Sequence, residues 1–201
     1  MELPEMPAGV EWGGDIAFLD RDGVLNIGSE DYINDVSELV VFPDAGESVA
    51  RIRRAGYRVC VVTNQSPIGR GLWGHQVLAA VNRALQKTLL MHDSDAHLDL
   101  ILYSPYAPWE RAWSRKGRPG MLQVGRQLFD AAVLGEGVAE FDYGPEYSPR
   151  EEGRSFMVGD RRADVEAGVS YGIRTYRCDG SVGLSTVIAK VLDDSDPGDY
   201  S

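Results

Sequence analysis

Short apolar runs that alternate with helical patterns are the feature that most constrains the fold of this chain. The runs are rich in β-branched and aromatic residues and are apolar on both faces, which is typical of strands in the middle of a parallel sheet. They cover residues 16–19, 59–62, 98–103, 155–158 and 173–176.

Helical patterns fill the intervals between these runs. Asp44 followed by Glu47 resembles a capping box, and the helix that it starts is expected to stop at Gly56. Further helices are predicted over residues 75–91, from Pro119 onward, over 163–171 and over 184–192. Strand–helix alternation of this kind predicts an α/β fold, with a doubly wound (Rossmann-like) parallel sheet.

The alternation defines the expected domain boundaries. Residues 15–192 are predicted to form a single domain, preceded by a flexible N-terminus at 1–14. Residues 193–201 are acidic and contain Pro and Gly, so we expect a disordered tail. The Gly-, Pro- and Glu-rich loop at 135–153 joins a helix end to a strand start. It is therefore expected opposite the active face, with an interaction role or none.

Amino-acid composition limits the classes of binding partner that we expect. There are 31 acidic and 20 basic residues, giving a net charge of −11, which disfavours nucleic acid and anionic membranes. We expect a small-molecule partner, no nucleic acid, no membrane, and a monomer or small homo-oligomer. Cys60 and Cys178 are a poor disulfide framework, and the first residues lack signal-peptide features. A cytoplasmic location is therefore expected.

Polar motifs follow the predicted strands, where ligands bind in sheets of this type. Each motif alone has an ordinary alternative: a polar turn, a helix cap or a solvated basic loop. A calcium loop is excluded because the third ligand and the closing Glu are missing. The motifs together, each at a strand end or helix start, indicate one convergent site. They are Asp20 and Asp22; Thr63, Asn64 and Gln65; Arg115 and Lys116; and Asp160 and Asp164.

These motifs resemble the four signature motifs of the HAD (haloacid dehalogenase-like) superfamily, over about residues 15–178. Segments 18–26, 63–66, 115–116 and 119–121 are most similar to one subgroup. It contains D-glycero-D-manno-heptose-1,7-bisphosphate 7-phosphatase and histidinol-phosphate phosphatase, and its members lack a large cap domain. The interval between Asp20 and Thr63 agrees, because a helix and a strand leave no room for a cap there.

The chain departs from the subgroup in its substrate-facing loop. The subgroup usually carries a Cys/His zinc loop before the Arg-Lys motif, whereas residues 104–114 contain neither Cys nor His. No structural zinc is therefore expected. Gly117 stands where the family usually has proline. Both changes affect the expected identity of the substrate more than the expected type of reaction.

The resemblance implies roles for the central residues. Asp20 would be the nucleophile that forms an aspartyl-phosphate, and Asp22 the general acid and base, which requires a raised pKa. Lys116 would neutralise charge during transfer. Mg²⁺ would be held by Asp20, the backbone carbonyl of Asp22, and Asp160. Asp164 would orient Lys116 or support the metal site.

Further residues are expected to contact substrate. Thr63 and Asn64 would donate hydrogen bonds to phosphate, and Gln65, Arg70 and Arg115 complete the predicted substrate-binding set. Trp109 and Trp113 lie one helical turn apart and are either packing residues or a substrate wall. The G-x-G-x-x-G pattern at 69–74 does not follow its strand directly, so dinucleotide binding is disfavoured.

The sequence therefore predicts a Mg²⁺-dependent hydrolase of phosphomonoesters. The expected substrate is a sugar phosphate such as D-glycero-D-manno-heptose 1,7-bisphosphate, with histidinol phosphate as the alternative. A phosphotransferase or a catalytically silent binding protein are alternatives of another class. The intact set of Asp20, Asp22, Lys116 and Asp160 disfavours a silent protein, since a relic site would be free to lose any of them.

Overall fold

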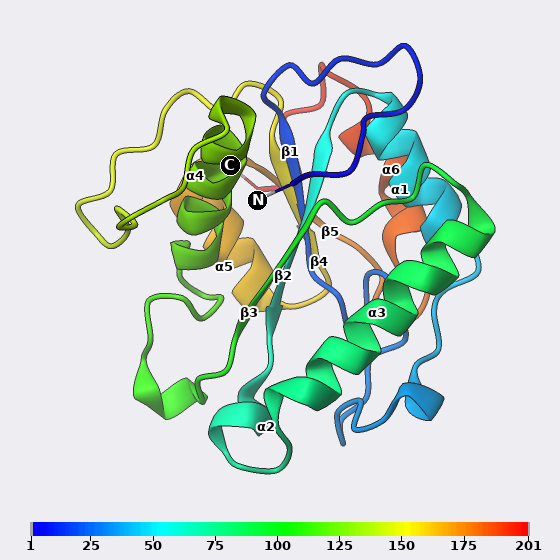
Figure 1. Ribbon diagram of the computed structural model, residues 1–201, viewed down its shortest axis with the longest axis vertical. Coiled ribbons are helices and arrows are strands. Elements are labelled where there is room, and N and C mark those ends of the chain that lie inside the picture. The colour runs from blue at the N-terminus through cyan, green and yellow to red at the C-terminus, as the bar shows by residue number, and fades with distance from the viewer. Residues whose placement is uncertain (1, 201) are drawn as a thin grey trace.

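A five-stranded parallel sheet forms the centre of the computed structural model, which describes residues 2–200. The strand order is β3-β2-β1-β4-β5, so the chain starts in the middle and winds outward in both directions (Figure 1). The strands are β1 (Ile16–Leu19), β2 (Arg58–Asn64), β3 (Leu100–Ser104), β4 (Phe156–Gly159) and β5 (Arg174–Arg177).

Helices cover both faces of the sheet (Figure 1). On one face lie α1 (Ala45–Arg54), α3 (His75–His92) and α6 (Ile188–Val191); on the other lie α4 (Gly120–Leu134) and α5 (Arg162–Tyr171). The side chains of β1 alternate between two apolar cores, with Leu19 in one and Phe18 in the other. This burial on both faces explains why the strand is apolar throughout. The short α2 (Ser66–Gly69) follows β2.

Register places the polar motifs at one edge of the sheet. Leu19, the last residue of β1, pairs with Val61 of β2 and with Val158 of β4. The residues that follow these positions therefore leave the sheet at the same end. Between Asp20 and Thr63 the described chain contains only a short 3-10 helix (Val36–Glu38), α1 and the start of β2. The expected fold without a large cap domain is confirmed.

Element ends differ from the predictions in two places. Asp44 precedes α1 as expected, but its side chain makes no capping hydrogen bond. The predicted last helix is divided into a 3-10 turn (Leu184–Thr186) and α6, with Val187 between them. No helix within residues 2–200 combines the length and the apolar character required to cross a bilayer.

The N-terminal segment packs on the domain over the part that the structure describes, where the sequence predicts flexibility for residues 1–14. The Trp12 ring lies 5.8 Å from the Phe129 ring, and Trp12 Nε1 donates to the carbonyl of Asp15 at 2.7 Å. Arg53 donates to the carbonyl of Glu5 at 2.7 Å. The partly buried Trp12 ring packs this segment against α4, and the hydrogen bond from Arg53 ties it to α1.

Residues 193–200 also contact the sheet, where the sequence predicts a disordered tail. The backbone N–H groups of Asp199 and Tyr200 donate to the carbonyl of Thr175 at 2.9 and 3.1 Å. Lys190 Nζ lies 2.6 Å from Asp199. Because β5 is an edge strand with unpaired backbone groups, it offers partners that composition alone does not reveal.

The loop at 135–153 returns along the outer side of α4 (Figure 1). Gly144 exchanges hydrogen bonds with the side chain of Gln123, near the first turns of α4. The middle of this loop therefore lies beside the segment that carries Lys116. The prediction that the loop lies opposite the active face is wrong for that part. The hydrogen bonds to the Gln123 amide hold Gly144 in this position.

Candidate active site

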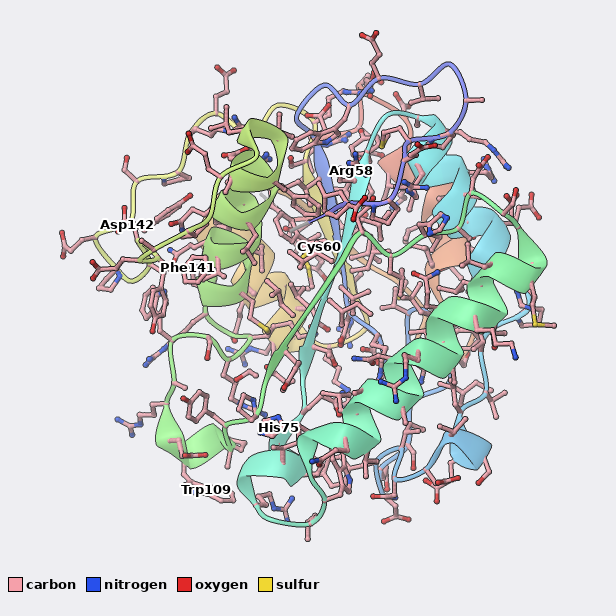
Figure 2. All side chains as sticks on the ribbon, in the orientation of Figure 1. Arg58, Cys60, His75, Trp109, Phe141 and Asp142 are labelled. Atoms are coloured by element: carbon pink, nitrogen blue, oxygen red, sulfur yellow. The ribbon has the colours of Figure 1, made fainter. Side chains whose placement is uncertain are left out.

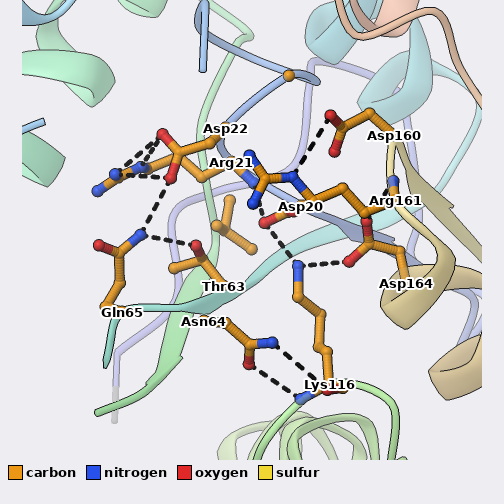
Figure 3. Close-up of polar contacts among 12 residues, drawn as sticks. Asp20, Arg21, Asp22, Thr63, Asn64, Gln65, Lys116, Asp160, Arg161 and Asp164 are labelled. Carbon is orange, nitrogen blue, oxygen red and sulfur yellow. Dashed lines mark hydrogen bonds and ion pairs between the residues drawn. The ribbon is translucent and has the colours of Figure 1, made fainter. Parts of the chain in front are cut away.

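The predicted motifs converge at the carboxyl ends of β1, β2 and β4 (Figure 3). Asp20 follows β1, Thr63 lies at the end of β2, Asp160 follows β4, and Lys116 arrives from the loop before α4. A cavity of about 290 Å³ opens beside them. Its walls include Asp20, Asp22, Thr63, Asn64, Arg70, Arg115, Lys116 and Asp164.

A buried lysine lies between two aspartates at the floor of the site. Lys116 Nζ is 2.6 Å from Oδ1 of Asp20 and 2.7 Å from Oδ1 of Asp164 (Figure 3). Burial lowers the pKa of Lys116, but the carboxylates of Asp164 and Asp20 outweigh burial and raise it, so the side chain stays an ammonium. Burial raises the pKa of Asp20 to about 7, against the opposing effect of Lys116.

The acidic groups of the site fit a divalent cation. One oxygen from each of Asp20, Asp160 and Asp164 lies within 4.8 Å of the others. Within residues 2–200, Oδ1 of Asp160 is buried without a hydrogen-bond partner. A Cβ at position 23 would lie 2.4 Å from Oδ2 of Asp160, so Gly23 (φ +80°) leaves the room that Asp160 occupies. Such carboxylate oxygens suit Mg²⁺.

Asp160 and Asp20 are better placed as metal ligands than Asp164. Asp164 already binds Lys116 through Oδ1 and accepts from the backbone N–H of Arg161 through Oδ2, at 3.0 Å. Burial and the neighbouring Asp164 charge raise the pKa of Asp160, and a bound cation would relieve that repulsion. The backbone carbonyl of Asp22 as a third ligand stays a prediction.

The carboxylate of Asp22 points away from Asp160 (Figure 3). Arg21 donates to it at 2.9 Å, Asn26 at 2.9 Å and Gln65 at 3.1 Å. Burial pushes the pKa of Asp22 upward, but the Arg21 charge and these hydrogen bonds lower it overall. The raised pKa that an acid role requires is therefore absent from this resting arrangement, and the expectation is corrected.

Two residues of the predicted substrate-binding set, Gln65 and Asn64, make hydrogen bonds to Asp22 and Lys116. Gln65 Nε2 donates to Asp22 and, at 2.9 Å, to Oγ1 of Thr63. Asn64 Oδ1 accepts from the backbone N–H of Lys116 at 2.9 Å, and Asn64 Nδ2 donates to its carbonyl at 3.4 Å. These amides contact Asp22 and the backbone of Lys116, and Asn64 also lines the cavity together with Thr63.

Arginines and a tryptophan form the rim of the cavity. Arg70 donates to the hydroxyl of Tyr32 at 2.7 Å, and Arg115 donates to the carbonyl of Tyr106 at 2.7 Å. Trp109 is 72% exposed and lies at the same end of the molecule as α2 (Figure 2). Trp113 is absent from the cavity wall among the described residues and serves packing instead.

Sequence reasoning missed several residues of the site, and Arg21 and Tyr32 are the most informative of them. Arg21 is only 1% exposed and pairs with Asp22; its position between the two aspartates is the signal that could have found it. Tyr32 lines the cavity with a φ of +66°, a conformation that costs free energy for a residue with a side chain and that clusters at functional sites. Nothing in the sequence pattern marks Tyr32.

The chain is similar in sequence to proteins that share one name. No family model matches the chain. It is 33% identical over 195 residues to a protein of Mesorhizobium japonicum, covering 90% of this chain and 78% of the relative. It is 32% identical over 157 residues to a Pseudomonas putida protein, covering 78% of each. A Pseudomonas aeruginosa protein is 40% identical over 111 residues, 55% of this chain and 61% of that protein. All three are named D-glycero-beta-D-manno-heptose-1,7-bisphosphate 7-phosphatase.

Solved structures agree with the fold. A HAD-like phosphatase from Mesorhizobium loti has a TM-score of 0.70 at 27% identity, covering 94% of this chain and 90% of its own. The D,D-heptose 1,7-bisphosphate phosphatase of B. bronchiseptica, complexed with magnesium and phosphate, has a TM-score of 0.72 at 22% identity, covering 90% of this chain and 99% of its own. Fold and site together define a phosphatase of the HAD superfamily. Within it, the chain belongs to the D-glycero-D-manno-heptose-1,7-bisphosphate 7-phosphatase family, as the relatives matched over 78% of their length show.

Proposed function

We propose that this protein is a Mg²⁺-dependent phosphatase that hydrolyses a sugar phosphate, D-glycero-D-manno-heptose 1,7-bisphosphate, with Asp20 as the nucleophile. The observation that carries the proposal is the convergence of Asp20, Asp22 and Lys116 on one cavity, with a carboxylate oxygen of Asp160 within 4.8 Å of one of Asp20. The names of the relatives and the magnesium and phosphate bound in the B. bronchiseptica enzyme support it.

The contacts of Asp20 fit nucleophilic attack. Its Oδ1 receives the backbone N–H of Arg21 at 2.7 Å and Lys116 Nζ at 2.6 Å. Oδ2 is then the oxygen left to attack phosphorus, forming the aspartyl-phosphate as the ester P–O bond breaks. Lys116 compensates the negative charge that gathers on the phosphoryl oxygens. Asp20, Asp160 and the Asp22 carbonyl would hold Mg²⁺, which would supply further positive charge to screen carboxylate–phosphate repulsion.

Asp22 acts as the general acid and then as the general base. It gives a proton to the leaving alkoxide, then takes one from the water that attacks the aspartyl-phosphate, which releases phosphate and restores Asp20. The lowered pKa of Asp22 suits the second step, where a carboxylate base is needed. The first step needs the acid form, and the negative charge of an incoming phosphate raises the pKa of Asp22 in that direction.

The basic rim favours a substrate with a second anionic group. Arg70, Arg115 and Arg161 all line the cavity, and Arg115 is the one that comes from the substrate-facing loop. Histidinol phosphate, the alternative, would bring an amine and an imidazole toward these arginines. Charge complementarity therefore favours the bisphosphate.

A phosphate-release assay tests the proposal. The panel comprises D-glycero-D-manno-heptose 1,7-bisphosphate, other sugar phosphates and histidinol phosphate, each with Mg²⁺ or with EDTA, beside the Asp20→Asn variant. We expect release from the heptose bisphosphate that needs Mg²⁺ and disappears in Asp20→Asn. Release that survives this substitution would refute the nucleophile. Inactivity on the whole panel would favour phosphotransfer to another acceptor, or binding alone.

We also propose that the protein works in a reducing, cytoplasmic environment on a small-molecule substrate. Cys60 and Cys178 are both free and buried, which suits a compartment without disulfide formation. A thiol titration that finds two reactive groups only after unfolding supports this, and an intermolecular disulfide in protein freshly isolated from cells would contradict it.

A further inference from the structure

We infer that Gln123 is a positioning residue for substrate binding, because its buried amide fastens the loop that carries Arg115. This loop (residues 104–118, here the rim loop) has no Cys or His with which to hold a metal. Hydrogen bonds must therefore supply the cross-link. The inference deepens the proposed phosphatase function, on which it rests, by naming what holds its substrate-facing wall.

The side chain of Gln123 joins three segments of the chain. It is 4% exposed, and its Oε1 accepts from Trp113 Nε1 at 2.8 Å and from the backbone N–H of Gly144 at 2.9 Å. Its Nε2 donates to the carbonyl of Gly144 at 3.2 Å. The rim loop, α4 and the 135–153 loop thus meet at one amide, whose hydrogen-bonding capacity is largely used.

Trp113 is held from two further sides. A Cβ at Gly120, in the first turn of α4, would lie 2.5 Å from the carbonyl oxygen of Trp113 and 2.7 Å from its Cδ1. The residue at position 120 must therefore be glycine for Trp113 to rest against the helix. The guanidinium of Arg118 lies 5.4 Å from the Trp113 ring centre. The indole is a fixed anchor for the rim loop.

Lys116 and Arg115 depend on this anchor to different degrees. Lys116 is held independently by Asn64, Asp20 and Asp164, and the next residue, Gly117, donates to the carbonyl of Ala163 at 2.9 Å. Among the described residues, the side chain of Arg115 donates only to the carbonyl of Tyr106, which belongs to the rim loop itself. Releasing Trp113 therefore displaces Arg115 while Lys116 stays in place.

This difference predicts an effect on substrate binding and not on the chemical step. Gln123→Met is nearly isosteric and removes all three side-chain hydrogen bonds, and Trp113→Phe removes the indole N–H together with part of the ring. We expect each to raise KM for D-glycero-D-manno-heptose 1,7-bisphosphate about tenfold, the scale of one lost hydrogen bond. The kcat should stay within about twofold of wild type, since Asp20 and Lys116 are not moved.

Probe and control variants sharpen the test. p-Nitrophenyl phosphate has no second phosphate for Arg115 to bind, so its KM should not change. Gln123→Glu keeps the acceptor for Trp113 and should restore most of the affinity. Gln127 exchanges hydrogen bonds with the backbone of Asp142 in the 135–153 loop, which lies beside α4 (Figure 2), and donates to the backbone carbonyl of Gln123 at 2.9 Å. Within residues 2–200 it makes no hydrogen bond to the rim loop. Gln127→Met should therefore leave both values of KM unchanged.

Limited trypsin digestion gives a readout that needs no activity. The rim loop contains Arg111 and Arg115, and cleavage there should be faster in Gln123→Met and Trp113→Phe than in wild type and Gln127→Met. The double variant should resemble each single variant, because both remove the same link. Wild-type inactivity on every substrate would contradict the proposed function and leave the trypsin comparison to decide the inference.

Three outcomes would overturn the inference. One is an equal fall in kcat on both substrates, which would place Gln123 in the catalytic step. Another is a KM increase that Gln127→Met reproduces, which would assign the effect to the 135–153 loop alone. The third is unchanged KM and trypsin cleavage in both Gln123→Met and Trp113→Phe.

Discussion

Nζ of Lys116 lies 2.7 Å from Oδ1 of Asp164, and both side chains are buried. Asp164 is itself fixed by two features of the turn after β4. A Cβ at Gly159 would lie 2.1 Å from Cβ of Asp164, so only glycine admits this approach, and the backbone N–H of Arg161 donates to Oδ2 of Asp164 at 3.0 Å. From this contact we propose that Asp164 orients Lys116 toward Asp20.

Asp164→Asn should therefore lower kcat about ten- to hundredfold and change KM little, because Lys116 loses the ion pair that orients its ammonium group. Steady-state kinetics with Mg²⁺ measure the effect. Glu166→Gln is the matched control on the same helix, since the one ion pair that Glu166 makes within residues 2–200 is with the exposed Arg162. A kcat equal to wild type in Asp164→Asn would show that Asp20 alone is enough to orient the lysine.

The Asp20 carboxyl should make the metal-free protein less stable as the pH rises. Burial raises its pKa from 3.8 to about 7 in the folded state. A group whose folded pKa is raised contributes stability that is complete below pH 4 and is lost as the pH rises through about 7. In EDTA, Asp20→Asn should therefore gain stability relative to wild type between pH 5 and pH 8.

Urea unfolding of both proteins at the two pH values measures this difference directly, because the other titrating groups are common to both. Mg²⁺ at pH 8 should stabilise wild type more than Asp20→Asn, since the cation offsets the carboxylate charge. A stability advantage of the variant that grows toward pH 5 would contradict the assigned direction of the pKa shift.

Sequence pattern was sufficient for the fold because the strands are buried on both faces. The run at 16–19 matches β1, and each other run overlaps a strand to within two residues at either end. Parallel pairing then puts Asp20, Thr63 and Asp160 at one edge of the sheet, which explains why spacing alone could group them.

The sequence pattern could not predict the directions of side chains or the paths of loops. Gln65 and Asn64 were expected to bind phosphate, but their amides are turned toward Asp22 and the Lys116 backbone. Asn and Gln at these positions could bind phosphate or hold neighbouring residues of the protein. Only their three-dimensional surroundings distinguish the two roles. Likewise, the return of Gly144 to α4 depends on the single amide of Gln123, which no periodicity marks.

Removing the charge of Arg21 should move the acidic limb of the kcat–pH profile to higher pH. Arg21 is the largest influence that lowers the pKa of Asp22, and the hydrolysis of the aspartyl-phosphate needs Asp22 as a base. In Arg21→Gln the pKa of Asp22 rises, and the limb should shift by about one pH unit. Arg21→Lys keeps the charge and should shift less. An unchanged limb in Arg21→Gln would remove Asp22 from the rate-determining proton transfer.

Arg115→Met should separate recognition of a second phosphate from hydrolysis of the first. Arg115 lines the cavity beside Lys116 but, within residues 2–200, has no contact with Asp20 or Asp22. A lost charged hydrogen bond to phosphate costs about 2 kcal/mol, so KM for the heptose bisphosphate should rise about thirtyfold with kcat retained.

The control for this prediction is Arg111→Met in the same loop. The side chain of Arg111 lines a neighbouring hollow with Arg115 and Arg118, but not the cavity of Asp20. Its loss should leave KM near the wild-type value, whereas general weakening of a basic surface would make the two variants alike. A monophosphate probe should show no difference between Arg115→Met and wild type. If KM for the monophosphate rose equally, Arg115 would contact the reacting phosphate, and the rim would carry no preference for a bisphosphate.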